Sequence, residues 1–268
     1  MPELAEVEFY RKQWDCGIGK AVDRIHLNGS ARIYRDANPR KIRKMLPGTT
    51  FRTSEAHGKQ MLFGFEPNLW LAAHLGMTGK LLVAGPEHQP EKHDHLVIYQ
   101  PDHSLIFRDS RKFGRIRFDQ GKAPPSWWTE LPPQPISPEF SRDRVTAYLA
   151  RHPKSVIKAL LLDQGGFPGI GNWMADEVLW RIRLHPATRG RDIPRSQAHL
   201  LRDEVRKLSF EALSIIGTDW SDPPDSWLFN HRWKDGGVCP RPTCKTPLIR
   251  EDLRGRTTCW CPKCQIAT

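Results

Sequence analysis

A proline-rich stretch near the middle of the chain limits the possible folds more than any other feature. Five prolines fall within residues 123–135. Proline fixes φ and has no N–H to donate, so we expect neither helix nor strand there and interpret the stretch as a domain linker. The chain before it and the chain after it differ in pattern. With 268 residues, the sequence predicts an α+β protein of more than one domain.

The half before the linker has the pattern of β structure. A first helix is predicted over residues 6–14, where apolar side chains recur at helical spacing. Short apolar runs divided by turn residues follow, which is typical of an antiparallel β-sandwich or barrel. A short helix is expected over residues 39–46. The predicted strands are 22–27, 50–56, 61–65, 70–75, 80–83, 95–99, 105–107 and 116–118.

The half after the linker has the pattern of helices. Ser137, Asn172 and Ser196 each precede apolar residues at helical spacing and are expected to cap helices. A glycine-rich turn at residues 165–171 leads into the second of these helices. Two interpretations of this turn remain open: an anion-binding turn at a helix N-terminus, or a structural corner between two helices.

The C-terminal tail carries the strongest local signal. Cys239 and Cys244 form one close pair, and Cys261 and Cys264 form a second pair after sixteen residues. This spacing is typical of a zinc site on a β-hairpin, and one ion held by four thiolates is structural because no coordination position stays open. Cys259 is a competing ligand, but it lies too close to Cys261 for both thiols to bind well. Free thiols are the alternative.

The charge balance indicates a polyanionic partner. Lys and Arg number 41 against 30 Asp and Glu, which gives a formal charge of +11. Nucleic acid is the first candidate and an acidic membrane surface the second. The sequence has no long apolar run and no apolar leader, so we expect neither a membrane span nor secretion. A reducing, cytoplasmic location follows, which favours metal-binding cysteines over disulfides.

The first three residues contain a candidate nucleophile. Removal of Met1 would leave Pro2 as the N-terminus, with a free secondary amine. An α-amine has a pKa of roughly 7.7–8.0, and an amine of this kind attacks an aldehyde or acetal carbon to give an iminium ion. Glu3 could transfer protons beside it. Many chains begin in this way, so a disordered terminus is the alternative.

Basic and apolar side chains also gather in predicted turns. Lys59 occupies a tight turn between two strands, and Arg111 and Phe113 share another. An exposed phenylalanine beside an arginine is suited to act as a wedge in a base stack. Arg256 flanks a glycine at the tip of the predicted zinc hairpin, where its guanidinium could contact phosphate. A solvated turn is the alternative for Lys59 and for Arg256.

Taken in order along the chain, these motifs resemble the bacterial formamidopyrimidine-DNA glycosylase and endonuclease VIII family. The resemblance covers nearly the whole length and is closest to the bacterial glycosylase. It depends on the N-terminal segment 2–8, residues 74–79, 91–95 and 109–114, residues 169–172 with Ala175 and Glu177, His185 with Pro186, and Gly255 and Arg256 before Cys261 and Cys264.

The resemblance implies a bifunctional DNA glycosylase and abasic-site lyase of base excision repair. Pro2 would attack C1′ of the damaged nucleotide, the base would leave, and elimination of the 3′- and then the 5′-phosphate would cut the strand. Glu3 would transfer protons at the sugar, and Lys59 would contact phosphate and assist catalysis. The implied partner is double-stranded DNA with damaged bases or abasic sites, bound by a monomer.

The resemblance also implies a set of DNA contacts. Some side chains would fill the gap left by an everted base, others would clamp the flanking phosphates, and two would add phosphate contacts. Met77, Arg111 and Phe113 would fill the gap. Asn172 and Arg256 would clamp the phosphates. His74 and Lys158 would add the further phosphate contacts.

The family's fold suggests how the chain is divided. We expect an N-terminal catalytic β-sandwich with a leading helix, a proline-rich linker, a helix–two-turns–helix domain, a lesion-side loop and a four-cysteine zinc finger. Their predicted ranges are 1–122, 123–136, 137–220, 221–238 and 239–268. Ala5 stands where the family usually has a proline. The segment 217–239 is shorter than the corresponding segment of the bacterial glycosylase, and it contains several tryptophans and prolines.

Two other functions remain in competition. A non-catalytic reader of damaged DNA could use the same basic surface and zinc hairpin without the chemistry. A zinc-ribbon transcription factor would explain the tail but not the N-terminus or the β half. The filled positions Pro2, Glu3 and Lys59 favour the enzyme.

Overall fold

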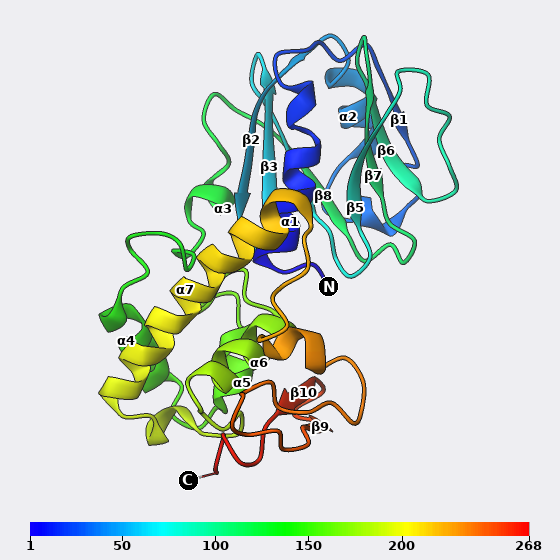
Figure 1. Cartoon of the computed structure of the whole chain (residues 1–268). Helices are drawn as coiled ribbons and strands as arrows, with labels where there is room; N and C mark the ends of the chain where they lie inside the picture. The colour runs from blue at the N-terminus through cyan, green and yellow to red at the C-terminus, as the bar shows by residue number, and fades with distance from the viewer. Residues whose placement is uncertain (268) are drawn as a thin grey trace. The chain divides into compact units, whose positions relative to one another are not determined.

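The computed structural model describes residues 1–267 and separates into two compact units. The first unit contains Met1–Pro2 and Glu6–Leu131, and the second contains Glu3–Ala5 and the chain from Pro132 onward. The division after Leu131 lies inside the stretch predicted as a linker. Figure 1 shows strands in the blue-to-green part of the chain and mainly helices from green to orange.

The first unit contains two four-stranded antiparallel sheets around one core. In one sheet the order is β2-β3-β4-β8, and in the other it is β1-β6-β7-β5. Apolar side chains of both sheets belong to the same buried cluster, so the predicted β-sandwich is confirmed. The strands are β1 (Arg24–Leu27), β2 (Thr50–His57), β3 (Gln60–Glu66), β4 (Leu69–His74), β5 (Lys80–Ala84), β6 (Asp94–Tyr99), β7 (Ser104–Arg108) and β8 (Arg115–Gln120).

Strand β3 illustrates why these residues form a sandwich. Met61, Phe63 and Phe65 lie at alternate positions, and all three are buried in the shared core. Side chains two residues apart in a strand point to the same face, so this face packs inward. Leu62, on the opposite face, is also buried, so β3 is covered on both faces.

Three α-helices accompany the sheets. Helix α1 (Leu4–Gln13) begins two residues earlier than predicted, and α2 (Pro39–Met45) is capped by the Asn38 side chain as a short helix. Helix α3 (Ser126–Thr129) lies inside the proline-rich stretch. The expectation of no helix there was wrong, because the prolines flank these four residues and Pro125 takes the N-cap position, where no N–H is needed. Two short 3₁₀ helices, η1 (Asp15–Gly17) and η2 (Arg32–Tyr34), connect the elements.

The second unit is built on four helices with a common apolar core. They are α4 (Arg142–Arg151), α5 (Ile157–Leu162), α6 (Asn172–Arg181) and α7 (Arg195–Asp219), accompanied by the 3₁₀ helices η3 (Gly190–Asp192) and η4 (Leu228–His231). Helix α7 is the long yellow helix of Figure 1.

Two predicted helix caps differ from those in the structure. Helix α4 starts after Ser141, whose hydroxyl accepts the N–H of Arg144 at 3.1 Å. Ser137 instead lies in a preceding turn, where its carbonyl accepts the N–H of Phe140. Helix α7 starts at Arg195 after Pro194, so Ser196 lies inside it. Serine is common in turns and first helical turns as well as at caps, which explains both errors.

A two-stranded hairpin closes the second unit. Strands β9 (Ile249–Asp252) and β10 (Thr257–Trp260) pair antiparallel. Arg254 and Gly255 at the tip have positive φ values of 54° and 76°, as a tight hairpin turn requires. Among residues 1–267, no helix is long and apolar enough to cross a membrane.

Candidate active site and nucleic-acid interface

The carboxylate of Glu3 lies at the N-terminus of helix α6. It accepts the backbone N–H of Trp173 at 2.9 Å and that of Met174 at 3.1 Å. First-turn N–H groups have no partner within their own helix and carry the positive end of its dipole. Glu3 is only 3% exposed, and the helix holds this carboxylate in one place.

Gly171 makes room for that carboxylate. A Cβ atom at this position would lie 2.2 Å from Cδ of Glu3. The backbone of Gly171 is extended, with φ −126°, a conformation that any residue adopts. Glycine is therefore required here by the close approach of Glu3 and not by its own backbone.

The glycine-rich turn connects α5 to α6, as the interpretation of a structural corner between two helices expected. An anion does bind the first N–H groups of α6, but it is the protein's own Glu3. Asn172 is not the N-cap, because Gly171 takes that position. The Asn172 side chain instead donates through Nδ2 to the carbonyl oxygen of Thr257 at 2.8 Å, which ties helix α6 to the hairpin.

Pro2 precedes this carboxylate by one peptide bond, and its side chain is partly exposed. In the printed sequence Met1 still acylates its nitrogen. A nucleophilic amine therefore exists only after Met1 is removed.

In the first unit, Lys59 lies in the turn between β2 and β3. Gly58 opens this turn with φ +59°. Lysines in turns are usually solvated, but Lys59 is only 6% exposed. Because a lysine is rarely buried unless it is paired, Lys59 has a role other than keeping the surface soluble.

His74 ends strand β4 as a neutral ring. Its Nδ1 accepts the N–H of Gly76 at 3.0 Å. Burial, with the nearby charge of Lys59 as the next cause, lowers the pKa of His74 to about 4. Because Nδ1 accepts, the single ring proton lies on Nε2. At neutral pH His74 can thus donate a hydrogen bond but brings no positive charge.

Met77, Arg111 and Phe113 project from two loops of the first unit. Met77 is 44% exposed and Phe113 is 42% exposed, and the Arg111 guanidinium lies over the Phe113 ring at 4.7 Å. Large apolar side chains exposed on turns are poorly placed for stability and well placed to contact a partner.

Asp109 fixes both of these loops. Its Oδ1 accepts the Thr78 hydroxyl at 2.6 Å and the Arg111 N–H at 3.2 Å, and its Oδ2 accepts the Gly114 N–H at 2.7 Å. Gly76 has φ +62°, and a Cβ there would lie 2.5 Å from the Phe113 backbone. The backbones of the two loops are therefore in contact. These contacts fix the loops that carry the exposed Met77, Arg111 and Phe113 side chains.

Lys158 lies in the interior of the second unit. Its side chain is 1% exposed, and its ammonium donates to the carbonyl oxygen of Asn172 at 2.7 Å and to Asp176 Oδ1 at 2.5 Å. A direct phosphate contact would require the ammonium to leave this carboxylate. Arg256, by contrast, is exposed at the hairpin tip.

Four cysteine sulfurs converge beside the hairpin. Cys239, Cys244, Cys261 and Cys264 have Sγ atoms within 4.8 Å of one another, with separations of 3.5 Å to 3.9 Å for the closest pairs. Ligands about 2.3 Å from a tetrahedral zinc ion lie roughly 3.8 Å apart. Cys259 is not in this group; burial raises the pKa of its thiol to about 12. The four predicted ligands, without Cys259, fit a metal ion.

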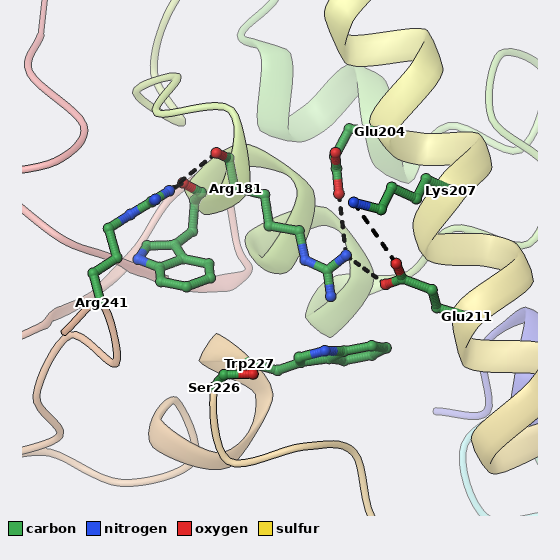
Figure 2. Close-up of a pocket in the computed structure, with 8 residues that line it drawn as sticks. Arg181, Glu204, Lys207, Glu211, Ser226, Trp227 and Arg241 are labelled. Carbon is green, nitrogen blue, oxygen red and sulfur yellow. Dashed lines mark hydrogen bonds and ion pairs between the residues drawn. The ribbon is translucent and has the colours of Figure 1, made fainter.

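Two other features of the described chain do not form sites. His88, Glu91 and Asp94 cluster in the first unit, but Arg108 pairs with both carboxylates. A pocket of about 380 Å³ in the second unit is lined by ion pairs of Arg181 with Glu204 and Glu211 (Figure 2). In both places these carboxylates are already paired with an arginine.

Comparisons with known proteins agree with this geometry. Residues 1–116 match the model of the formamidopyrimidine-DNA glycosylase N-terminal domain, and residues 131–222 match that of its H2TH domain. The formamidopyrimidine-DNA glycosylase of Roseiflexus sp. is 33% identical over 99% of this chain and 100% of its own length. That of Solibacter usitatus is 34% identical over 99% of both chains. The chain belongs to the formamidopyrimidine-DNA glycosylase family.

Solved structures of the family support the same assignment. Lactococcus lactis formamidopyrimidine-DNA glycosylase bound to DNA with an abasic site matches with a TM-score of 0.86 and 28% identity. The same protein with DNA containing Fapy-dG matches with a TM-score of 0.88 and 28% identity. Each match covers 99% of this chain and 100% of the other. The predicted family and fold are confirmed, and the chain is a DNA-repair glycosylase.

Sequence reasoning missed several residues that support the glycosylase site. Asp109 and Asp176 are fully buried carboxylates that organise the exposed loops and the interior of the second unit. Gly171 is needed for Glu3 to reach helix α6. The motif ranges 109–114 and 169–172 contained Asp109 and Gly171 without showing their roles, and for Asp176 the signal was a polar residue inside an apolar helical pattern.

Proposed function

We propose that this glycosylase is bifunctional and cuts DNA through an N-terminal proline. The observation that carries the proposal is Glu3, held by two N–H groups of α6 directly after Pro2. A fixed carboxylate beside a secondary amine is the arrangement that iminium chemistry needs, because each step moves a proton.

The proposed reaction has two stages. The unprotonated Pro2 nitrogen attacks C1′ of the damaged nucleotide, and the C1′–N bond to the base breaks as the base leaves with a proton. The Pro2 nitrogen then loses its proton, the C1′–O4′ bond opens with a proton transferred to O4′, and an iminium ion remains between Pro2 and C1′. Loss of a C2′ proton then expels the 3′-phosphate, and a second elimination expels the 5′-phosphate. We assign proton transfer at the sugar to Glu3, and phosphate contact with catalytic assistance to Lys59.

We propose double-stranded DNA with oxidised bases or abasic sites as the substrate. The exposed Met77, Arg111 and Phe113 would fill the space left by an everted base. Asn172 and Arg256 would bind the phosphates beside the lesion, and His74 would donate from Nε2 to a further phosphate. Family members solved with Fapy-dG and abasic-site DNA support this class of substrate.

We also propose that the four cysteines hold one structural zinc ion. Four thiolates favour zinc among common metals and leave no position for substrate. The indole N–H of Trp180 donates to Cys239 Sγ at 3.3 Å, a contact that stabilises a metal-bound thiolate. The ion would keep the hairpin folded and take no part in the chemistry.

The remaining expectations stay part of the proposal. We propose a five-part division of the chain at residues 122, 136, 220 and 238, a monomeric state, and action in the bacterial cytoplasm at the nucleoid. Relatives of similar length in bacteria support the bacterial setting. The short loop 221–238 is stiffened by stacking of Trp227 on Trp173 at 6.4 Å, and we expect it to influence which base is accepted.

Borohydride trapping tests the chemistry. The protein without Met1 should form a covalent adduct with a duplex that carries an abasic site, and Pro2→Gly or retained Met1 should abolish it. The pattern across 8-oxoguanine, formamidopyrimidine, 5-hydroxycytosine and thymine glycol duplexes would define the accepted base. Tight binding with no adduct on any duplex would instead support the alternative, a non-catalytic reader of damaged DNA.

A further inference from the structure

Asp176 connects three separate segments of the second unit. It lies on α6 one turn after Asn172 and is 1% exposed. Its Oδ1 accepts Lys158 of α5 at 2.5 Å. Its Oδ2 accepts Arg232, after η4, at 2.5 Å and the backbone N–H of Cys259, on β10, at 3.0 Å. Helix α5, the lesion-side loop and the hairpin thus meet at one carboxylate.

Two of these contacts link Asp176 indirectly to Asn172. Lys158 also donates to the Asn172 carbonyl oxygen. On β10, Thr257 lies two residues before Cys259, and its carbonyl oxygen accepts the Asn172 side chain. Asn172 is therefore held at its backbone through Lys158 and at its side chain through the hairpin, and both supports depend on Asp176.

The charges of this cluster have few other partners. Lys158, Arg232 and Asp176 are all at most 4% exposed, so water cannot replace a lost contact. The Asp176 carboxylate forms ion pairs with both Lys158 and Arg232. Removing its charge takes away the carboxylate that both cations contact directly, which a buried site tolerates poorly.

We propose that Asp176 is a positioning residue for the DNA clamp: through Lys158 and the β10 backbone it sets the place of Asn172 and of the hairpin that carries Arg256. This inference rests on the proposed role of Asn172 and Arg256 in binding phosphate. Lys158 acts within the protein and does not itself contact DNA.

Three variants test this role. Asp176→Asn removes the shared charge. Lys158→Met removes the bond to Asn172 but leaves the Asp176–Arg232 pair, so it should fold even if Asp176→Asn does not. Glu177→Gln is the matched control, because Glu177 is an equally buried carboxylate on the next position of α6. Among its partners, Arg181 keeps Glu204 and Glu211, as Figure 2 shows. The Phe229 N–H, which donates to Glu177 at 3.0 Å, can still donate to the amide oxygen of glutamine.

The measurement is equilibrium binding to a duplex with an abasic-site analogue over a range of salt concentrations, well below the unfolding temperature. We expect Lys158→Met and Asp176→Asn to bind about tenfold more weakly, as for a lost hydrogen bond, and Glu177→Gln to bind as wild type. The slope of log K against log salt should not change in Lys158→Met. Since Lys158 acts through Asn172, Asn172→Ala with Lys158→Met should bind no more weakly than Asn172→Ala alone.

Either of two results would overturn the inference. The first is binding by Lys158→Met, or by folded Asp176→Asn, equal to that of Glu177→Gln. The second is a slope shallower by about 0.9 in Lys158→Met, which would mean that Lys158 neutralises a phosphate directly. Trapping of the wild-type protein on abasic DNA is measured in parallel; its failure would refute the proposed chemistry while leaving the binding comparison valid.

Discussion

Replacing Gly171 with alanine should displace the Glu3 carboxylate. The new Cβ would lie 2.2 Å from Cδ and 2.4 Å from Oε1 of Glu3, so the side chain must leave its position. The extended backbone at Gly171 accepts alanine without strain, which makes the collision the only direct effect. This variant therefore tests the position of one carboxylate and leaves its chemistry intact.

The size of the effect follows from the bonds lost. Glu3 would give up its hydrogen bonds to the N–H groups of Trp173 and Met174. Hydrogen bonds to charged groups contribute about 1.5–3 kcal/mol each, and partial solvation of the displaced groups reduces the sum. We expect a loss of about 2–4 kcal/mol in the free energy of unfolding. A misplaced proton-transfer group should slow covalent trapping by roughly a hundredfold or more.

The assay pairs single-turnover borohydride trapping on an abasic duplex with denaturant unfolding. Gly165→Ala in the same turn is the control, because its Cβ would lie 3.4 Å from Asp163 Oδ1, an ordinary contact. That variant should stay within about 0.5 kcal/mol of wild type and trap normally. Wild-type trapping and stability in Gly171→Ala would refute the assigned position of Glu3.

The remaining predictions concern pH, salt and metal. His74 has its pKa lowered from 6.5 to about 4, so the neutral ring supports folding above pH 6.5, and that support is lost as the pH falls towards 4. It amounts to at most about 3 kcal/mol; unfolding of His74→Gln should lack this pH dependence, and an unchanged profile would contradict the assignment. Arg256→Gln should reduce the salt slope of DNA binding by about 0.9, whereas an unchanged slope would remove Arg256 from the clamp. Chelation should weaken DNA binding strongly and change the unfolding temperature of the first unit little. Full affinity after verified metal loss would exclude the hairpin from the DNA contact.

The sequence by itself determined the parts of the molecule that depend on local pattern. The eight strands of the sandwich follow from short apolar runs, because this pattern acts within a few residues. The cluster of four cysteines follows from spacing alone, since a hairpin brings two close pairs together. The order of the motifs was enough to identify the family.

The tertiary structure decided which groups meet across long distances in the chain. Glu3 and Trp173 are 170 positions apart, and no local pattern shows that the glycine-rich turn binds a carboxylate of the same chain. Lys158 resembles a phosphate ligand in sequence, but the structure encloses its ammonium beside Asp176. A buried charge is determined by the partners that packing supplies. Those partners come from distant segments, so the supports of the candidate site are visible only in the folded molecule.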